Sequence, residues 1–100
     1  MVHLSWPIII KLIKEHPEFV SHKEGTEIDP NGEMTAFCEF ERKGQQAQKK
    51  YFSLEDAKKL NVLDRAVWKH HLKEMLLARA RRLAAQSMFP DILNKQEANA

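Results

Sequence analysis

The stretch that decides the fold is Trp68–Pro90, WKHHLKEMLLARARRLAAQSMFP, which keeps a helical period without Gly or Pro until it ends at Pro90. The positive charge also collects here. Six Lys/Arg and one Glu lie between Arg65 and Arg82, a net charge of +5, whereas the whole chain carries only +2. The pattern predicts one long helix that is both a core element and the main carrier of cations.

On a helical wheel of this stretch, at about 100° per residue, one sector is apolar and is expected to face a sheet. This sector consists of Trp68, Leu72, Met75, Leu76 and Leu83. A second apolar strip on the opposite side is either covered by the protein or offered to a partner. This strip consists of Leu77, Ala84 and Met88.

Arg79 is the anomaly of the wheel, because it falls in the middle of the first apolar sector. A buried guanidinium without a partner would cost several kcal/mol. We therefore expect Arg79 either to pair with an acid such as Asp56 or Asp64, or to emerge into a groove where it contacts an anion. Lys69 and Lys73, four positions apart, are expected to share one flank of the helix.

The rest of the chain predicts an α+β domain, a three-stranded antiparallel meander packed against helices in the order α-β-β-β-α-α. Ser5-Trp6-Pro7 opens a first helix, which His16-Pro17 ends. Turn signals at residues 29–32 and 43–45 separate the strands, and such short turns favour an antiparallel meander. The strands are expected over residues 19–28, with a possible bulge at Gly25, over residues 34–42 and over residues 48–52.

Alternation within the second strand directs Met34, Ala36, Cys38 and Phe40 toward one face. After the third strand, Ser53-Leu-Glu-Asp56 is typical of a capping box that starts a short helix. Asn61 is expected to stop this helix in the left-handed conformation, and Asp64 to cap the long helix. One domain over residues 1–93 and a frayed tail over residues 94–100 complete the predicted organisation.

Composition and motifs exclude several classes of protein. No apolar run approaches the ~20 residues that a membrane-spanning helix needs, and no basic leader indicates a signal peptide. The lone Cys38 fits a reducing compartment and a core position. There is no Gly-rich phosphate loop and no Ser/His/Asp order. The adjacent His70 and His71 point about 100° apart on a helix, so they cannot chelate one metal together. We expect no enzymatic activity, no cofactor and no metal site.

Three motifs stand in order between residues 51 and 93: YFSLEDAKKL (51–60), WKHHLKEMLLARA (68–80) and FPDIL (89–93). At this spacing they resemble the RecT/Bet type of phage recombinase, in which DAk, Trp, Met-Leu, Arg-Ala and FPD follow one another. Members of that family are ATP-independent single-strand annealing proteins. The resemblance covers about Lys49 to Leu93 and is weaker before it.

The resemblance implies a protein of phage or prophage origin that acts in the cytoplasm of a bacterial host. Its partner would be single-stranded DNA, or a duplex intermediate of annealing. Self-association would be expected, with no membrane and no small-molecule substrate. Lys73 and Arg79 stand at positions that match phosphate contacts in the family. With the neighbouring cations, the expected nucleic-acid-binding residues are Lys69, Lys73, Arg79, Arg81 and Arg82.

Two further expectations concern stacking and an alternative function. Tyr51 and Trp68 are the candidate platforms for DNA bases, and Trp68 is favoured as a core residue. The alternative function is a protein-interaction or oligomerisation module of prophage origin that has lost DNA binding. Its contact would be the strip of Leu77, Ala84 and Met88.

Overall fold

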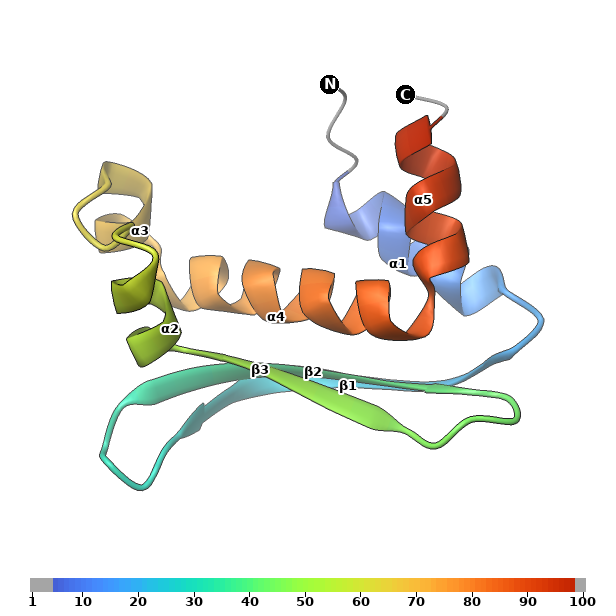
Figure 1. Cartoon of the computed structure of the whole chain (residues 1–100), viewed down its shortest axis with the longest axis horizontal. Helices are drawn as coiled ribbons and strands as arrows, with labels where there is room; N and C mark the ends of the chain where they lie inside the picture. Colours follow the sequence, from blue (N-terminus) through green and yellow to red (C-terminus); the bar gives the residue numbers. More distant parts are fainter. Residues whose placement is uncertain (1–4, 99–100) are drawn as a thin grey trace.

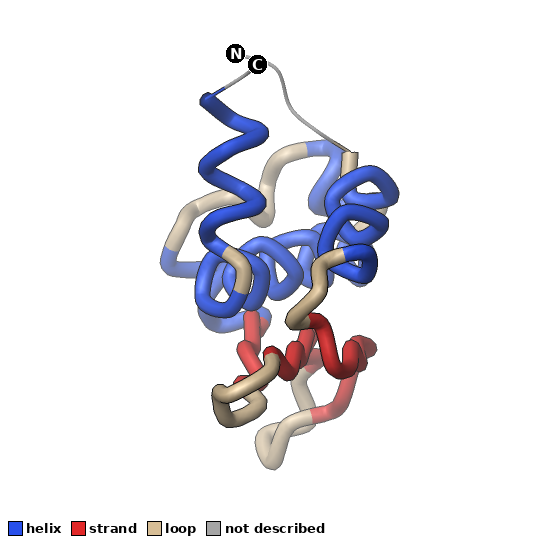
Figure 2. The backbone as a smooth tube through the Cα atoms, turned by 90° about the vertical axis from the view of Figure 1, so that its right-hand side faces the viewer, coloured by secondary structure: helices blue, strands red, loops and turns tan. Residues whose placement is uncertain are grey.

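The computed structural model describes residues 5–98, and their side chains as far as residue 94. Within this range, three antiparallel strands form one sheet, and all the helices lie on one of its two faces (Figure 1). Figure 2 shows the same two layers from the side. The predicted α+β class is confirmed. The elements are α1 (Trp6–Glu15), β1 (Phe19–Ile28), β2 (Met34–Arg42), β3 (Gln48–Ser53), α2 (Leu54–Lys59), α3 (Ala66–His70), α4 (Leu72–Met88) and α5 (Pro90–Ala98).

The meander follows from its turns. The Asp29 carboxylate accepts hydrogen bonds from the backbone N–H groups of Asn31 and Glu33, both at 2.9 Å. Gly32 has φ +81°, a left-handed conformation that glycine adopts without steric cost. The predicted bulge at Gly25 is wrong, because the register is irregular between Phe19 and Ser21 instead. Gly25 lies opposite Phe37, and a Cβ there would lie 3.3 Å from the ring of Phe37.

The core lies between the sheet and α4. As predicted, the alternating residues of β2 turn one face inward, and Ala36, Cys38 and Phe40 are completely buried. Helix α4 lies mainly over β2 and β3. It presents a row of residues four apart to the sheet, which are Leu76, Ala80, Ala84 and Met88, all buried. Alanine in this row lets the helix backbone approach the strands closely.

The single long helix predicted around Trp68 is interrupted at His71, whose backbone (φ −135°, ψ 47°) is not helical. A wheel started at Trp68 in α3 therefore has the wrong phase in α4. Leu83, assigned to the core sector, is 41% exposed, and Arg79 is exposed as well. Of the two alternatives for the second strip, cover by the protein is the one observed, since Ala84 and Met88 are buried and Leu77 is half-buried.

The short helices show which local signals decide their ends. The capping box at Ser53 is confirmed: its Oγ accepts from the Asp56 N–H at 3.1 Å, and the Ser53 N–H donates to Asp56 at 2.9 Å. Asn61 has φ 55°, as expected of a left-handed stop. The predicted cap at Asp64 is wrong, because Arg65 occupies the N-cap position of α3 without a side-chain bond.

A helix continues past Leu93 into the segment for which a frayed tail is predicted. Pro90 stands at the start of α5, a position that proline tolerates, and the helix runs to Ala98. Frayed structure was expected from residue 94, and residues 99–100 lie outside the described range. No helix in the described range is long and apolar enough to cross a membrane.

Arg42, at the end of β2, forms hydrogen bonds to the junction of α4 and α5. The guanidinium of Arg42 donates to Glu18 at 2.6 Å, to Asp91 at 2.9 Å and to the carbonyl of Met88 at 2.9 Å. It also lies 4.9 Å from the centre of the Phe89 ring. The hydrogen bond from Arg42 is the main cause that lowers the pKa of Asp91 to about 2. This contact fixes where α5 leaves the end of α4.

Candidate nucleic-acid interface

The five cations predicted to bind nucleic acid lie on two helices. Lys69 is on α3, and the other four are on α4. Lys69, Lys73, Arg79 and Arg82 are exposed, whereas Arg81 is only partly exposed. The structure therefore separates Arg81 from the other four cations. The separation arises because Arg81 lies on a different face of α4 from Arg79 and Arg82.

Arg79 and Arg82 point away from the sheet. They are three positions apart in an unbroken helix, so they are neighbours on its surface. We call this surface, formed by Arg79, Arg82 and the exposed Gln86, the outer α4 face. Arg79 has no carboxylate within ion-pair distance among the described side chains. Of the two alternatives for Arg79, the pairing with Asp56 or Asp64 is absent, because the side chain is exposed.

Lys69 and Lys73 lie on either side of the interruption at His71. The prediction that they share one flank assumed a continuous helix, and the non-helical backbone of His71 removes that relationship. Both side chains are exposed and belong to the N-terminal end of the same helical layer. They extend the positive charge of the outer α4 face toward α3.

Arg81, in contrast, reaches down toward the sheet. Its guanidinium donates to the Glu24 carboxylate at 2.6 and 3.0 Å, and it lies 5.3 Å from the centre of the Trp6 ring. The side chains of Arg81 and Glu24 are 25% and 19% exposed. Because its charge is already neutralised by Glu24, we leave Arg81 out of the proposed contact surface.

Glu24 is the centre of a partly buried polar group beneath α4. Its carboxylate also bonds to the His22 ring at 2.9 Å, and strand pairing places Cys38 directly opposite it. Burial lowers the pKa of His22, against the effect of Glu24. Burial would raise the pKa of Glu24, but the bonds and charges of Arg81 and His22 lower it overall. Burial also raises the pKa of the Cys38 thiol to about 12.

The potential ligand atoms of His22, Glu24 and Cys38 lie within 4.8 Å of one another, so these residues are of the type that holds a metal ion. Sequence spacing does not show this group, because the pairing of β1 with β2 assembles it. Both oxygens of Glu24 already have partners in Arg81 and His22. A metal ion would have to displace them, and in the present arrangement the group joins α4 to β1.

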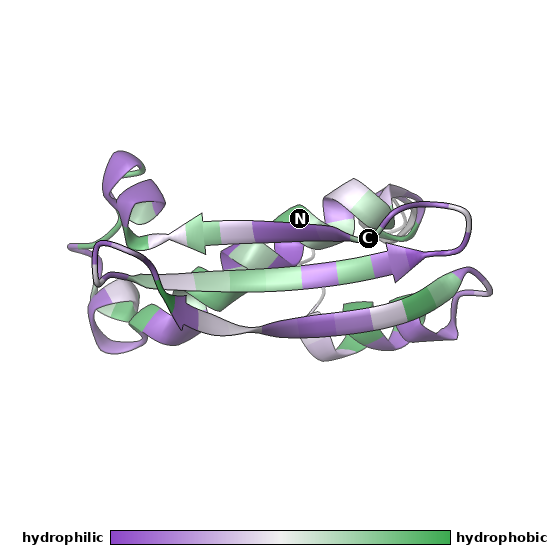
Figure 3. Ribbon diagram, turned by 90° about the horizontal axis from the view of Figure 1, so that it is seen from below, coloured by the Kyte–Doolittle hydropathy of each residue, from purple (hydrophilic) through white to green (hydrophobic). Residues whose placement is uncertain are grey.

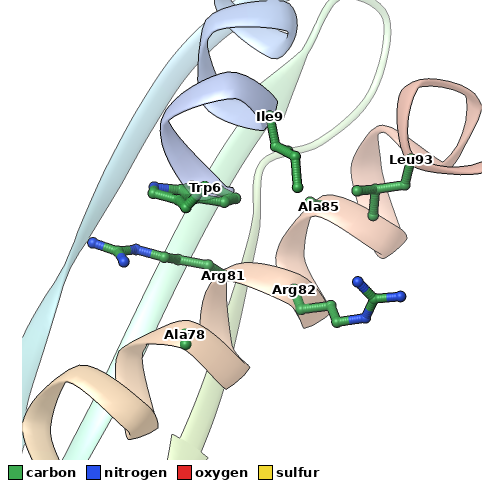
Figure 4. A pocket seen from close by; sticks show the side chains of 7 residues that line it. All are labelled: Trp6, Ile9, Ala78, Arg81, Arg82, Ala85 and Leu93. Carbon is green, nitrogen blue, oxygen red and sulfur yellow. The ribbon is translucent and has the colours of Figure 1, made fainter. Parts of the chain in front are cut away.

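A small hollow opens beside the outer α4 face, where α1, α4 and α5 meet (Figure 4). Its volume is about 180 Å³. Figure 4 shows Arg81 and Arg82 leaving consecutive positions of α4 in different directions around it. The residues that line this α1–α4–α5 hollow are Trp6, Ile9, Ala78, Arg81, Arg82, Ala85 and Leu93.

The two aromatic residues expected to stack on bases lie in different environments. Trp68 is 2% exposed and packs against Phe52, with ring centres 6.4 Å apart, so it is a core residue. Tyr51 is 48% exposed but lies beside Phe37 on the far face of the sheet. No pattern in the sequence indicates a functional role for Trp6, which is predicted only to lie at the start of a helix. The fold is what brings it next to Arg81.

Comparisons with known proteins identify no relative: no family model, no curated protein and no solved structure matches the chain. The site is therefore interpreted from its own residues.

Proposed function

We propose that this protein binds single-stranded DNA through the outer α4 face, as part of ATP-independent strand annealing of the phage recombinase type. One observation carries the proposal: the cations of α3 and α4 other than Arg81 are exposed on the helical layer, and Arg79 and Arg82 form a pair on one helix face. Between Arg65 and Arg82 only Glu74 opposes them.

The charge distribution favours a polyanion as the ligand. The 65–82 segment carries +5 and the remaining residues sum to −3, so the positive potential is local to this surface. Contacts between exposed arginines and phosphates depend little on base sequence and release counterions on binding. The arrangement suits a protein that holds a strand by its backbone and leaves bases available for pairing.

In the described part of the chain, the two carboxyl groups with lowered pKa values, those of Asp91 and Glu24, have structural partners. The strongly perturbed carboxyl, Asp91, is bonded to Arg42 and His16 at a helix junction. Glu24, whose pKa is also lowered, is paired with Arg81. In both cases the perturbed group belongs to a structural ion pair.

The proposal is tested by fluorescence anisotropy with a labelled single-stranded oligonucleotide over a range of salt concentrations. Replacing both outward arginines (Arg79→Ala, Arg82→Ala) should weaken binding about tenfold, or about 1.4 kcal/mol. It should also make the slope of log affinity against log salt shallower by about 1.4, because each phosphate contact on a single strand contributes roughly 0.7.

The matched control removes two exposed lysines elsewhere, Lys23→Ala on the far face of the sheet and Lys43→Ala in the second hairpin turn. It lowers the net charge by the same amount and should leave the salt slope unchanged. If both double variants lose affinity equally, binding reflects only overall charge and the assigned surface is wrong.

A second candidate function, a module for self-association or protein contact, is favoured by a different observation. Among residues 5–98, no helix covers the far face of the sheet (Figure 3). Tyr51 and Phe37 lie on this face, and Lys49 Nζ lies 5.1 Å from the ring centre of Tyr51 and 4.3 Å from that of Phe37. The strip first considered for this function, Leu77, Ala84 and Met88, is packed on the sheet and does not serve it.

Sedimentation velocity tests this candidate with Tyr51→Lys and a matched control, Val67→Lys on α3, since both side chains are 48% exposed. If the sheet face mediates self-association, only the Tyr51 variant shifts the distribution toward monomer. An unchanged distribution for Tyr51→Lys removes this surface as an interface.

A further inference from the structure

The α1–α4–α5 hollow is continuous with the outer α4 face. Arg82 belongs to both, and Ala78 at the edge of the hollow directly precedes Arg79 in the helix. A strand that contacts Arg79 and Arg82 through its phosphates therefore passes the mouth of this hollow (Figure 4).

The lining of the hollow is apolar inside and cationic at the edge. Ile9, Ala85 and Leu93 are 8%, 0% and 3% exposed and form its interior, and the partly exposed indole of Trp6 forms one side. Among the described side chains, the charged residues that line it are Arg81, which is paired with Glu24, and Arg82 at the edge. This combination is complementary to a ligand that has a flat apolar body and an attached anion.

The volume of the hollow limits the size of the ligand that it can hold. Pockets for drug-sized ligands have volumes of roughly 300–1,000 Å³, whereas this one has about 180 Å³. A single ring system fits that scale better than a whole nucleotide or a peptide segment. In a nucleic acid strand, such a ring is joined to a phosphate by a short sugar linkage.

We propose that the hollow receives one base of the bound DNA strand, against Trp6, while the neighbouring phosphate contacts Arg82. This inference rests on the proposed single-strand binding and adds a base contact to it. Stacking on an aromatic side chain is tolerant of base identity. The hollow therefore anchors the strand without reading its sequence, and the other bases remain free to pair.

The test compares an oligonucleotide with an abasic strand of equal length, and it measures anisotropy and tryptophan fluorescence together. The chain has two tryptophans, and Trp68 is buried, so quenching by DNA reports on Trp6. We expect the normal strand to quench this fluorescence and to bind about 5- to 100-fold more tightly than the abasic strand.

A filling variant tests the hollow without disturbing the core. Ala78→Leu adds bulk at an exposed helix position, where leucine is also a good helix former. In this variant, the ratio of the affinities for the normal and the abasic strand should fall toward one. The slope of log affinity against log salt should not change. The matched control, Ala66→Leu, makes the same substitution at an exposed position of α3, outside the hollow and outside the outer α4 face, and should keep the preference.

Three outcomes overturn the inference, and they are distinguishable. Equal affinity for both strands without quenching refutes the base contact and leaves phosphate binding intact. Failure of both strands to bind refutes the base contact together with the proposed function. A Trp6→Phe variant that shows the same quenching as the original protein also contradicts it, because the signal then comes from elsewhere.

Discussion

Arg81 and Arg82 are adjacent in the sequence, yet they belong to different parts of the molecule. Arg81 points to the sheet, bonds to Glu24 at 2.6 Å and lies over the ring of Trp6. Arg82 is exposed on the outer α4 face with Arg79. One step of about 100° along the helix separates a structural ion pair from a surface suited to phosphate. A cluster of cations in a sequence is therefore not one functional unit until its helix faces are known.

The largest effect should come from removing the inward arginine. Arg81→Ala leaves the Glu24 carboxylate partly buried without its main partner, so we expect a loss of about 3 kcal/mol in the free energy of unfolding. Urea denaturation followed by circular dichroism measures it. The control Arg79→Ala, at an exposed position of the same helix, should change stability by less than about 0.5 kcal/mol. If both variants lose the same free energy of unfolding, the inward arginine does not stabilise the fold more than an outward one.

A conservative change sharpens the same comparison. Arg81→Lys keeps the charge but cannot place two N–H groups on the carboxylate and stack on Trp6 at the same time. We expect a loss of about 1 kcal/mol in the same urea experiment. A lysine variant as stable as the original protein would show that charge alone, rather than the shape of the guanidinium, holds α4 to β1.

A smaller decrease in the free energy of unfolding is expected when the pH is lowered. The pKa of His22 lies below 6.5, chiefly because burial disfavours its charged form. As the pH falls below 6.5, the unfolded chain binds a proton that the folded chain resists, so stability declines in this window. The lowered pKa of Glu24 adds a further decline below about pH 4.5.

We therefore expect a lower urea midpoint at pH 5 than at pH 7. His22→Gln should remove much of this difference, because glutamine does not titrate and can still bond to Glu24. If the urea midpoint of the original protein is the same at both pH values, burial does not lower the pKa of His22 in the folded chain.

Local signals in the sequence predicted most of the elements. The turn at Asp29–Gly32, the capping box at Ser53 and the stop at Asn61 depend on residues within a few positions, and each is confirmed. The alternation in β2 is also local and identified Ala36, Cys38 and Phe40 as core. Such features need no knowledge of the remainder of the chain.

The errors arose where a long-range contact or a change of phase decides the outcome. The interruption at His71 has no Gly or Pro to announce it, and it rotated the predicted faces of α4. This is why the wheel puts Arg79 within the apolar sector that faces the sheet, and Met88 on the opposite side, whereas Arg79 is exposed and Met88 is buried. The pair of Arg81 with Glu24 joins residues 57 positions apart, so no local pattern could reveal it.

The most direct test observes the arginines themselves. In a spectrum that resolves side-chain Nε–H groups by NMR, added single-stranded oligonucleotide should shift the signals of Arg79 and Arg82. The signal of Arg42 should stay in place, because its guanidinium group remains bonded to Asp91. If the Arg81 signal moves while those of Arg79 and Arg82 do not, the outer α4 face is not the DNA-binding surface.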